Sequence, residues 1–198
     1  MTNMKTKITV VLFLLFTINL FSQDSKFSIE ANFPILIDNN HYGENYNGII
    51  DLGLKYRISN FGFMDLGFAL NTSLFNTNYK ISSDITTFEI KENILFIRPK
   101  VFSEIIIKSN EKIHPTIGLG YTFIESKVSA NSSDFPNESE SYSDNGLNLY
   151  LGIAYDITNK IFIQAQYDYI KKKVSKEIPD YKYYSNINFL NIGLGYRF

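Results

Sequence analysis

Apolar and polar side chains alternate along most of the chain after residue 24, with the two-residue period of β-strands. The alternation is clearest near the end of the chain, where Leu190, Ile192 and Leu194 fall on one face and Asn191 and Gly193 on the other. The same pattern predicts eight strands, at residues 26–37, 47–58, 61–75, 92–107, 112–125, 146–157, 160–172 and 185–198. The sequence therefore predicts an all-β protein.

The connections between the predicted strands alternate between long and short. Long polar stretches span residues 38–46, 76–91, 126–145 and 173–184, and tight turns span residues 58–60, 108–111 and 158–159. Short turns at one end and long loops at the other are typical of up-and-down transmembrane barrels, with periplasmic turns and extracellular loops. We therefore predict an eight-stranded antiparallel up-and-down transmembrane β-barrel whose outer loops carry any specific function.

One face of the predicted strands is apolar almost throughout, and the other gathers the charges. The polar face holds seven of the eleven glycines and eleven charged residues, namely Glu30, Asp51, Lys55, Arg57, Asp65, Arg98, Lys100, Glu104, Asp156, Asp168 and Arg197. Glycine is a poor choice for the exposed middle of a strand, but it makes room for long side chains inside a small barrel. The charged face is therefore predicted to line the lumen.

Two strands fit this division less cleanly, and one soluble architecture competes with it. Leu36 joins the polar face of the first strand, and Phe96, Phe102 and Ile106 join that of the fourth. A soluble lipocalin-like binding barrel has the same number of strands but an apolar interior and a wet outside. The eleven charges on the glycine-rich face favour the membrane barrel, as does the lack of tryptophan, which lipocalins typically carry near their first strand.

The first 23 residues have the features of a secretory signal peptide. Lys5 and Lys7 precede an almost uninterrupted apolar run from Ile8 to Phe21, and Ser22 is a small residue near a plausible cleavage point. The run is shorter than the roughly 20 residues of a membrane-spanning helix. We predict a cleaved signal peptide at residues 1–23, export across the inner membrane, and a barrel domain at residues 24–198.

The last predicted strand carries a more specific pattern. Leu190, Ile192, Leu194, Tyr196 and Phe198 alternate along it, and the sequence ends on the aromatic residue. This ending resembles the assembly signal of bacterial outer-membrane barrels, and the chain is similar to small barrels of the OmpA-like and OmpX-like superfamily, or porin family. The resemblance implies a monomer in the Gram-negative outer membrane, inserted by the barrel-assembly machinery, in contact with lipid and lipopolysaccharide. It also implies a structural, adhesive or envelope-stability role.

The predicted lumen is the first candidate site. The interior of an eight-stranded barrel is just wide enough to be filled by side chains. An unpaired buried charge costs on the order of several kcal/mol, so the inward charges are expected to form a paired, structural network that plugs the barrel. The alternative function is a narrow channel or small-molecule carrier, similar to OmpW-like barrels.

Composition excludes several other functions. The 198 residues contain no cysteine, which rules out disulfides, thiolate metal sites and cysteine nucleophiles. His41 and His114 are too few for a histidine-rich metal site, and the formal net charge of −1 argues against nucleic-acid binding. We predict no metal, no cofactor and no nucleic-acid partner.

No catalytic residue is predicted either. Some small outer-membrane barrels are lipid A deacylases or acyltransferases, and such enzymes need a nucleophile and a base within hydrogen-bond reach. Neither histidine occurs with the required serine and acid, so we interpret His114 as a polar residue near a turn and His41 as a solvated loop residue.

Two of the predicted outer loops differ in charge. The third, rich in serine, is acidic and the fourth is basic, with Lys171, Lys172 and Lys173 at its start. Both are interpreted as solvated loops. Divalent-cation bridges to lipopolysaccharide in the third and contact with anionic headgroups in the fourth are the alternatives.

Overall fold

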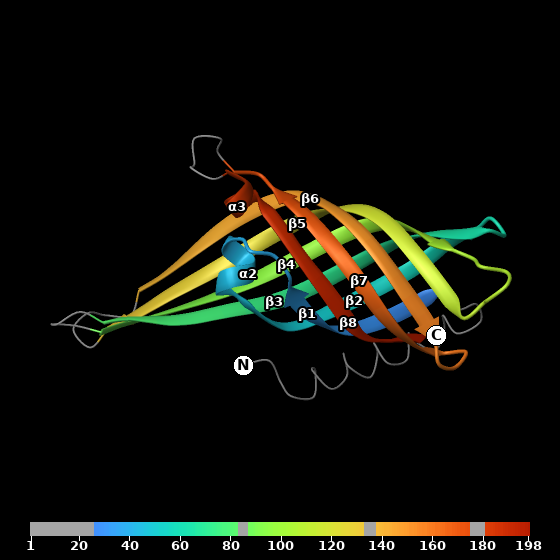
Figure 1. Cartoon of the computed structure of the whole chain (residues 1–198), viewed down its shortest axis with the longest axis horizontal. Helices are drawn as coiled ribbons and strands as arrows, with labels where there is room; N and C mark the ends of the chain where they lie inside the picture. The colour runs from blue at the N-terminus through green and yellow to red at the C-terminus, as the bar shows by residue number, and fades with distance from the viewer. Residues whose placement is uncertain (1–25, 83–86, 133–137, 175–180) are drawn as a thin grey trace, which may run out of the picture.

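The computed structural model describes residues 26–82, 87–132, 138–174 and 181–198 (Figure 1). The predicted signal peptide, residues 1–23, lies outside the described residues. Eight antiparallel strands form one closed barrel in which each strand pairs with its neighbours in sequence and β8 pairs with β1. The predicted eight-stranded up-and-down barrel is confirmed.

The barrel wall consists of β1 (Phe27–Leu36), β2 (Asn47–Asn60), β3 (Met64–Ser82), β4 (Thr87–Ile105), β5 (Ile113–Ser132), β6 (Glu138–Asp156), β7 (Ile161–Lys172) and β8 (Asn186–Arg197). Two short helices, α2 (His41–Asn45) and α3 (Tyr181–Ser185), lie in the β1–β2 and β7–β8 connections. Within these described segments, no helix has the length and hydropathy needed to cross a membrane. We call the end with the short β2–β3, β4–β5 and β6–β7 connections the turn end, and the opposite one the loop end.

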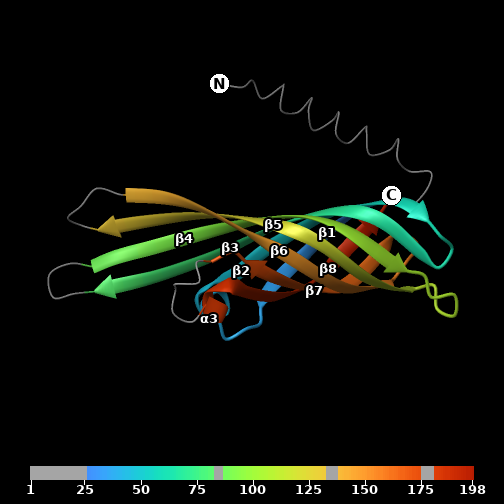
Figure 2. The ribbon, with the colours of Figure 1, turned by 90° about the horizontal axis from the view of Figure 1, so that it is seen from above.

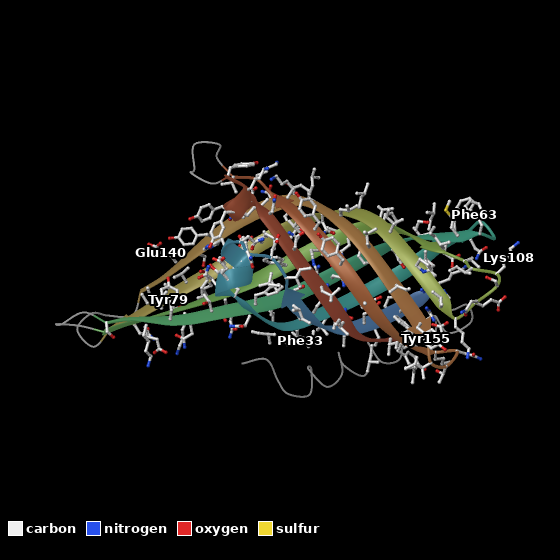
Figure 3. All side chains as sticks on the ribbon, viewed as in Figure 1. Phe33, Phe63, Tyr79, Lys108, Glu140 and Tyr155 are labelled. Atoms are coloured by element: carbon white, nitrogen blue, oxygen red, sulfur yellow. The ribbon has the colours of Figure 1, made fainter. Side chains whose placement is uncertain are left out.

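The alternation read from the sequence sorts side chains between the two surfaces of the wall. On β2, Leu52 is 52% exposed on the outside, whereas Asp51 is fully buried inside. Outward rings such as Phe33 and Tyr155 project from the barrel surface (Figure 3). The outside of the barrel is thus apolar and the charged residues of the wall lie inside, the reverse of a soluble barrel.

Glycines on the inner surface make room for aromatic rings from the neighbouring strand. Phe162 pairs with Gly195, and a Cβ atom built on that glycine would lie 2.0 Å from the ring's Cζ atom. Phe102 lies between Gly67 and Gly118 on its two neighbouring strands. A Cβ atom on Gly67 would lie 2.7 Å from the Cζ atom of Phe102. These glycines let large rings fill the lumen.

Strands β3 to β6 continue past the barrel rim as a four-stranded sheet, which we call the blade (residues 77–82, 87–92, 126–132 and 138–144). Pairing of β2 with β3 stops at Asn76, and pairing of β6 with β7 stops at Gly146. The blade projects from the loop end, beside α2 and α3 (Figures 1 and 2).

The blade corrects the prediction of solvated loops at residues 76–91 and 126–145, because most of both segments is strand. The strands of the blade are held together by backbone hydrogen bonds, and both faces of the sheet contact water. Neither face therefore has to be apolar, and the sequence shows little hydrophobic alternation. The other two long connections also differ from the prediction, since each contains a helix. In α2, the side chain of Asn40 accepts hydrogen bonds from the backbone N–H groups of Tyr42 and Gly43 at 3.0 and 2.9 Å.

Candidate functional site

The centre of the lumen is built around one fully buried arginine. Arg98 on β4 forms ion pairs with Asp51 on β2 and with Asp168 on β7, the latter at 2.8 Å. The Nζ atom of Lys100 lies 2.7 Å from the second carboxylate oxygen of Asp168. Neutral side chains complete the cluster: Asn32, Asn71 and Ser73 donate to Asp51, and Asn148 and Asn191 donate to Asp168. Both carboxylates are therefore surrounded by donors.

A second ion pair lies nearby. Lys55 on β2 contacts Glu30 on β1 at 2.6 Å, and the Gln166 side-chain amide donates to Glu30 at 2.9 Å. The ammonium groups of Lys55 and Lys100 lie 5.5 and 4.4 Å from the ring centre of Tyr150. The ring therefore joins this pair to the central cluster through cation–π contacts.

A third cluster occupies the turn end. Arg57 contacts Glu104 at 2.8 Å, and Arg197 pairs with Asp156. His114 lies between these pairs, with Nε2 2.8 Å from Asp156 and Nδ1 3.4 Å from Glu104. His114 is the second residue of β5, so it lies near a turn as expected, and its side chain belongs to the inward face of that strand, where it contacts two carboxylates.

The structure places the eleven charged residues predicted to line the lumen in these three clusters. Asp65 is at the edge, with a carboxylate oxygen 4.0 Å from the Nε atom of Arg57 and a 2.7 Å hydrogen bond from the Asn60 side chain. The other ten are each in an ion pair of 2.8 Å or less. Each of the three clusters therefore contains both acidic and basic side chains in contact with one another.

Above the central cluster, toward the loop end, the lumen is apolar. Seven side chains that are 0–1% exposed form what we call the apolar layer: Phe75, Ile94, Phe96, Ile124, Ile170, Ile187 and Phe189. The ring centres of Phe75 and Phe96 are 5.0 Å apart, and the Arg98 guanidinium lies 4.5 Å from the ring centre of Phe189. Tyr42 of α2 and Tyr46, which follows this helix, pack on the layer from the loop-end side.

Sequence reasoning missed the apolar layer, although its signal was present. Phe96 and Phe102 fell on the polar face of the fourth predicted strand, and both are inside the barrel and 1% exposed. Leu36, the exception in the first strand, packs against the layer. Ile106 follows the end of β4 and is half-buried. Three of these four exceptions therefore marked apolar packing inside the lumen.

A cavity of about 570 Å³, which we call the mouth pocket, lies on the outer side of the apolar layer. Its walls come from α2, the inner face of the blade and the end of β7, and they include four tyrosines and three carboxylates: Tyr42, Tyr46, Tyr79, Tyr142, Glu44, Glu92 and Asp144. Figure 3 labels Tyr79 and Glu140 on the blade. The mouth pocket thus combines aromatic rings and charged groups in one cavity.

Hydrogen bonds tie the walls of the mouth pocket together. The Tyr46 hydroxyl donates to Glu92 at 2.7 Å, and the Tyr183 hydroxyl of α3 donates to Glu44 at 2.6 Å. The Nζ atom of Lys172 lies 2.7 Å from Asp144. These contacts join the two short helices and β7 to the blade.

The environment of His41 differs from the one predicted. This histidine is not a solvated loop residue but a half-buried member of α2, with its ring centre 5.4 Å from those of Tyr42 and Tyr184. Burial, followed by the nearby ammonium of Lys172, lowers the pKa of His41 below its usual value. The imidazole is therefore neutral at physiological pH. These contacts could not be predicted from the sequence, because half of them are made by residues of α3, which is far from His41 along the chain.

On the outside, the five residues of the predicted assembly signal follow the outward face of β8 and the residue after it. Ile192 and Leu194 are exposed, and Leu190 and Tyr196 are partly exposed. The Phe198 ring lies 5.6 Å from that of Phe27 on β1, and its backbone N–H donates to the Phe27 carbonyl at 3.1 Å. These contacts help to close the barrel at the turn end.

The family model described as "Outer membrane protein beta-barrel domain" matches residues 8–198, and the chain belongs to this family. It is an integral outer-membrane β-barrel protein. The soluble lipocalin-like alternative is thereby overturned, in agreement with the apolar outer surface. No protein of curated function matches the chain.

Solved structures show the same fold. A major outer-membrane protein of Thermus thermophilus is 15% identical, with a TM-score of 0.62, covering 87% of this chain and 99% of that one. The attachment invasion locus protein Ail of Yersinia pestis is 20% identical, with a TM-score of 0.52 and coverage of 87% and 97%. Neisserial surface protein A is 15% identical, with a TM-score of 0.53 and the same coverage.

Proposed function

We propose that this protein is an adhesive outer-membrane barrel with a plugged lumen, and that the blade is its docking surface. The observation that supports this proposal is the shape of the blade, which is a four-stranded sheet beyond the barrel rim with two open edges. Among the described residues, β3 beyond Asn76 has no partner strand on its β2 side, and β6 before Asn145 has none on its β7 side. Open strand edges bind extended polypeptides by adding a strand to the sheet.

The surface composition of the blade supports this role. Its outer face carries polar residues of both signs, such as Lys80, Glu89 and Lys127, together with serines and asparagines. Its inner face presents the rings of Tyr79 and Tyr142, which are 48% and 54% exposed. Tyrosine, serine and asparagine are the residues that binding surfaces use for adaptable contacts.

Shortening one hairpin of the blade tests adhesion. Asn76 and Asn93 are cross-strand partners, so residues 77–92 can be replaced by an Asn-Gly turn without shifting the register. Cells displaying the shortened protein should lose binding to immobilised extended peptides, while the heat-dependent shift in gel mobility shows that the barrel still folds. The Lys108→Gln variant, which changes an exposed residue at the turn end and keeps the whole blade, is the matched control. Equal binding by the shortened and full-length proteins would refute adhesion through the blade.

The plugged lumen is supported by the apolar layer and the paired charges below it. Seven apolar side chains at 0–1% exposure pack together inside the barrel, and such a layer is expected to block the passage of water and ions. We expect purified protein in planar bilayers to give no stepwise conductance. Steady single-channel currents would instead favour the alternative of a narrow channel or carrier.

We propose no catalytic role, because both ring nitrogens of His114 face carboxylates rather than a hydroxyl nucleophile. The signal peptide at residues 1–23, recognition of the Phe198 end by the barrel-assembly machinery, and the monomeric state belong to the same proposal. So does contact with lipopolysaccharide, which is supported by Lys171 on the outward face of β7 and by the exposed Lys173 just after the end of this strand. Mass measurement of the exported protein tests cleavage of the signal peptide.

A further inference from the structure

The mouth pocket combines a negative charge balance with aromatic walls. Glu44, Glu92 and Asp144 contribute three carboxylates, against the single ammonium of Lys172. His41, the remaining titratable base in the lining, is neutral at physiological pH because burial lowers its pKa. The pocket therefore has an excess of negative charge, next to ring faces that attract cations.

The protein itself shows how this pocket holds an ammonium group. The Nζ atom of Lys172 lies 2.7 Å from a carboxylate oxygen of Asp144 and 5.5 Å from the ring centre of Tyr42. A carboxylate on one side and a tyrosine ring on the other are the two contacts that stabilise an alkylammonium ion in a partly desolvated site. Lys172 thus occupies one cation position with a side chain of the protein's own.

A second position has the same chemistry and no cation. Within the described ranges, no lysine or arginine lies within ion-pair distance of Glu92 or Glu44. Glu92 accepts a hydrogen bond from Tyr46, whose pKa is raised by burial and by that carboxylate, so the hydroxyl stays protonated and the carboxylate stays an acceptor. Tyr79 shares the inner face of the blade with Glu92 and is 48% exposed.

We propose that the mouth pocket binds a small organic cation with a primary ammonium group, held by Glu92 with Tyr46 and Tyr79. The cavity of about 570 Å³ is in the size range of small-molecule sites, roughly 300–1,000 Å³. The ammonium can belong to a free amine or to a lysine side chain. This inference goes beyond adhesion and does not depend on it, because the ligand enters the pocket rather than pairing with an edge of the blade.

The test is calorimetric titration of the full-length protein in bilayer nanodiscs. The probes are cadaverine, a free diamine, and a capped lysine, with the diol analogue of cadaverine as the neutral control. We expect both amines to bind in a salt-dependent manner and the diol not to bind. Tighter binding of cadaverine would identify a free amine as the ligand, and tighter binding of capped lysine a polypeptide side chain. Binding of the diol as tightly as the diamine, or no binding of either amine, would overturn the proposal.

Three variants locate the binding. Glu92→Gln should weaken amine binding by about tenfold or more, the loss of one charge-assisted contact. Glu89→Gln, on the outer face of the same strand, should leave it unchanged. Lys172→Met should strengthen it severalfold, because Asp144 and the Tyr42 face become free for the ligand. Equal weakening by Glu92→Gln and Glu89→Gln would indicate general surface attraction and overturn the site.

Discussion

Replacing Arg98 by methionine tests whether the lumen is a dry, paired network. The substitution keeps much of the side-chain length but removes the cation that faces both Asp51 and Asp168. Asp168 retains Lys100, whereas Asp51 is left with the neutral donors Asn32, Asn71 and Ser73. Removing one partner of a buried ion pair costs about 3–5 kcal/mol, because the other charge stays buried without compensation.

The free energy of unfolding can be measured by urea titration in lipid vesicles, with the folded fraction read from the heat-dependent shift in gel mobility. Adding Asp51→Asn to Arg98→Met should recover part of the loss, because the uncompensated charge is then gone. The matched control is Lys91→Met on the same strand. Lys91 forms an exposed 3.4 Å ion pair with Glu89, and such pairs contribute about 0–1 kcal/mol.

A loss of stability for Arg98→Met as small as that for Lys91→Met would refute the paired network. If Arg98→Met cost less than about 1 kcal/mol, as expected for an exposed pair, the central charges would be solvated. Water would then reach the middle of the barrel, and the plugged lumen would have to be abandoned.

Three further predictions concern the wall, the apolar layer and the end of the chain. Leu194→Arg should cost about 2–4 kcal/mol in vesicle unfolding, because Leu194 is 55% exposed on the outer surface; no loss would mean that this face meets water. Phe96→Ala should cost about 3–5 kcal/mol by the same measurement, through the cavity left in the apolar layer. Deleting Phe198 should lower the folded fraction in the outer membrane while export continues, as measured by cell fractionation, and unchanged assembly would contradict the predicted signal.

The barrel wall was predictable because lipid and lumen impose opposite demands on neighbouring residues. Leu52 and Leu54 face lipid and have to be apolar, whereas Asp51 and Lys55 face the lumen and form polar contacts there. Because neighbouring residues face opposite sides of the wall, the sequence alternates with a period of two. The blade is under no such demand. Asn78 and Lys80 face water on one side of the blade, and Tyr79 faces a solvated pocket on the other. Because neither face has to be apolar, the blade strands lack hydrophobic alternation and their sequence resembles that of loops.

The sites at the loop end could not be predicted for a different reason. Phe96 and Ile170 contribute to one apolar layer only because the register of the barrel brings them to the same height. Glu92 and Tyr46 meet because α2 folds over the barrel mouth. Such groupings depend on tertiary contacts, and no local period of the sequence records them.

The rings that lie over glycines limit how this sequence can change over evolutionary time. Phe162 fills the space above Gly195, and Phe102 fills the space between Gly67 and Gly118. A larger residue at position 195 has no room unless the ring at position 162 becomes smaller. A Cβ atom at position 67 or 118 would in addition meet a backbone carbonyl oxygen, that of Tyr56 at 2.3 Å or that of Val101 at 2.6 Å. In related barrels, a larger residue at position 195 should therefore occur together with a smaller one at position 162, whereas positions 67 and 118 should remain glycine whatever the size of residue 102.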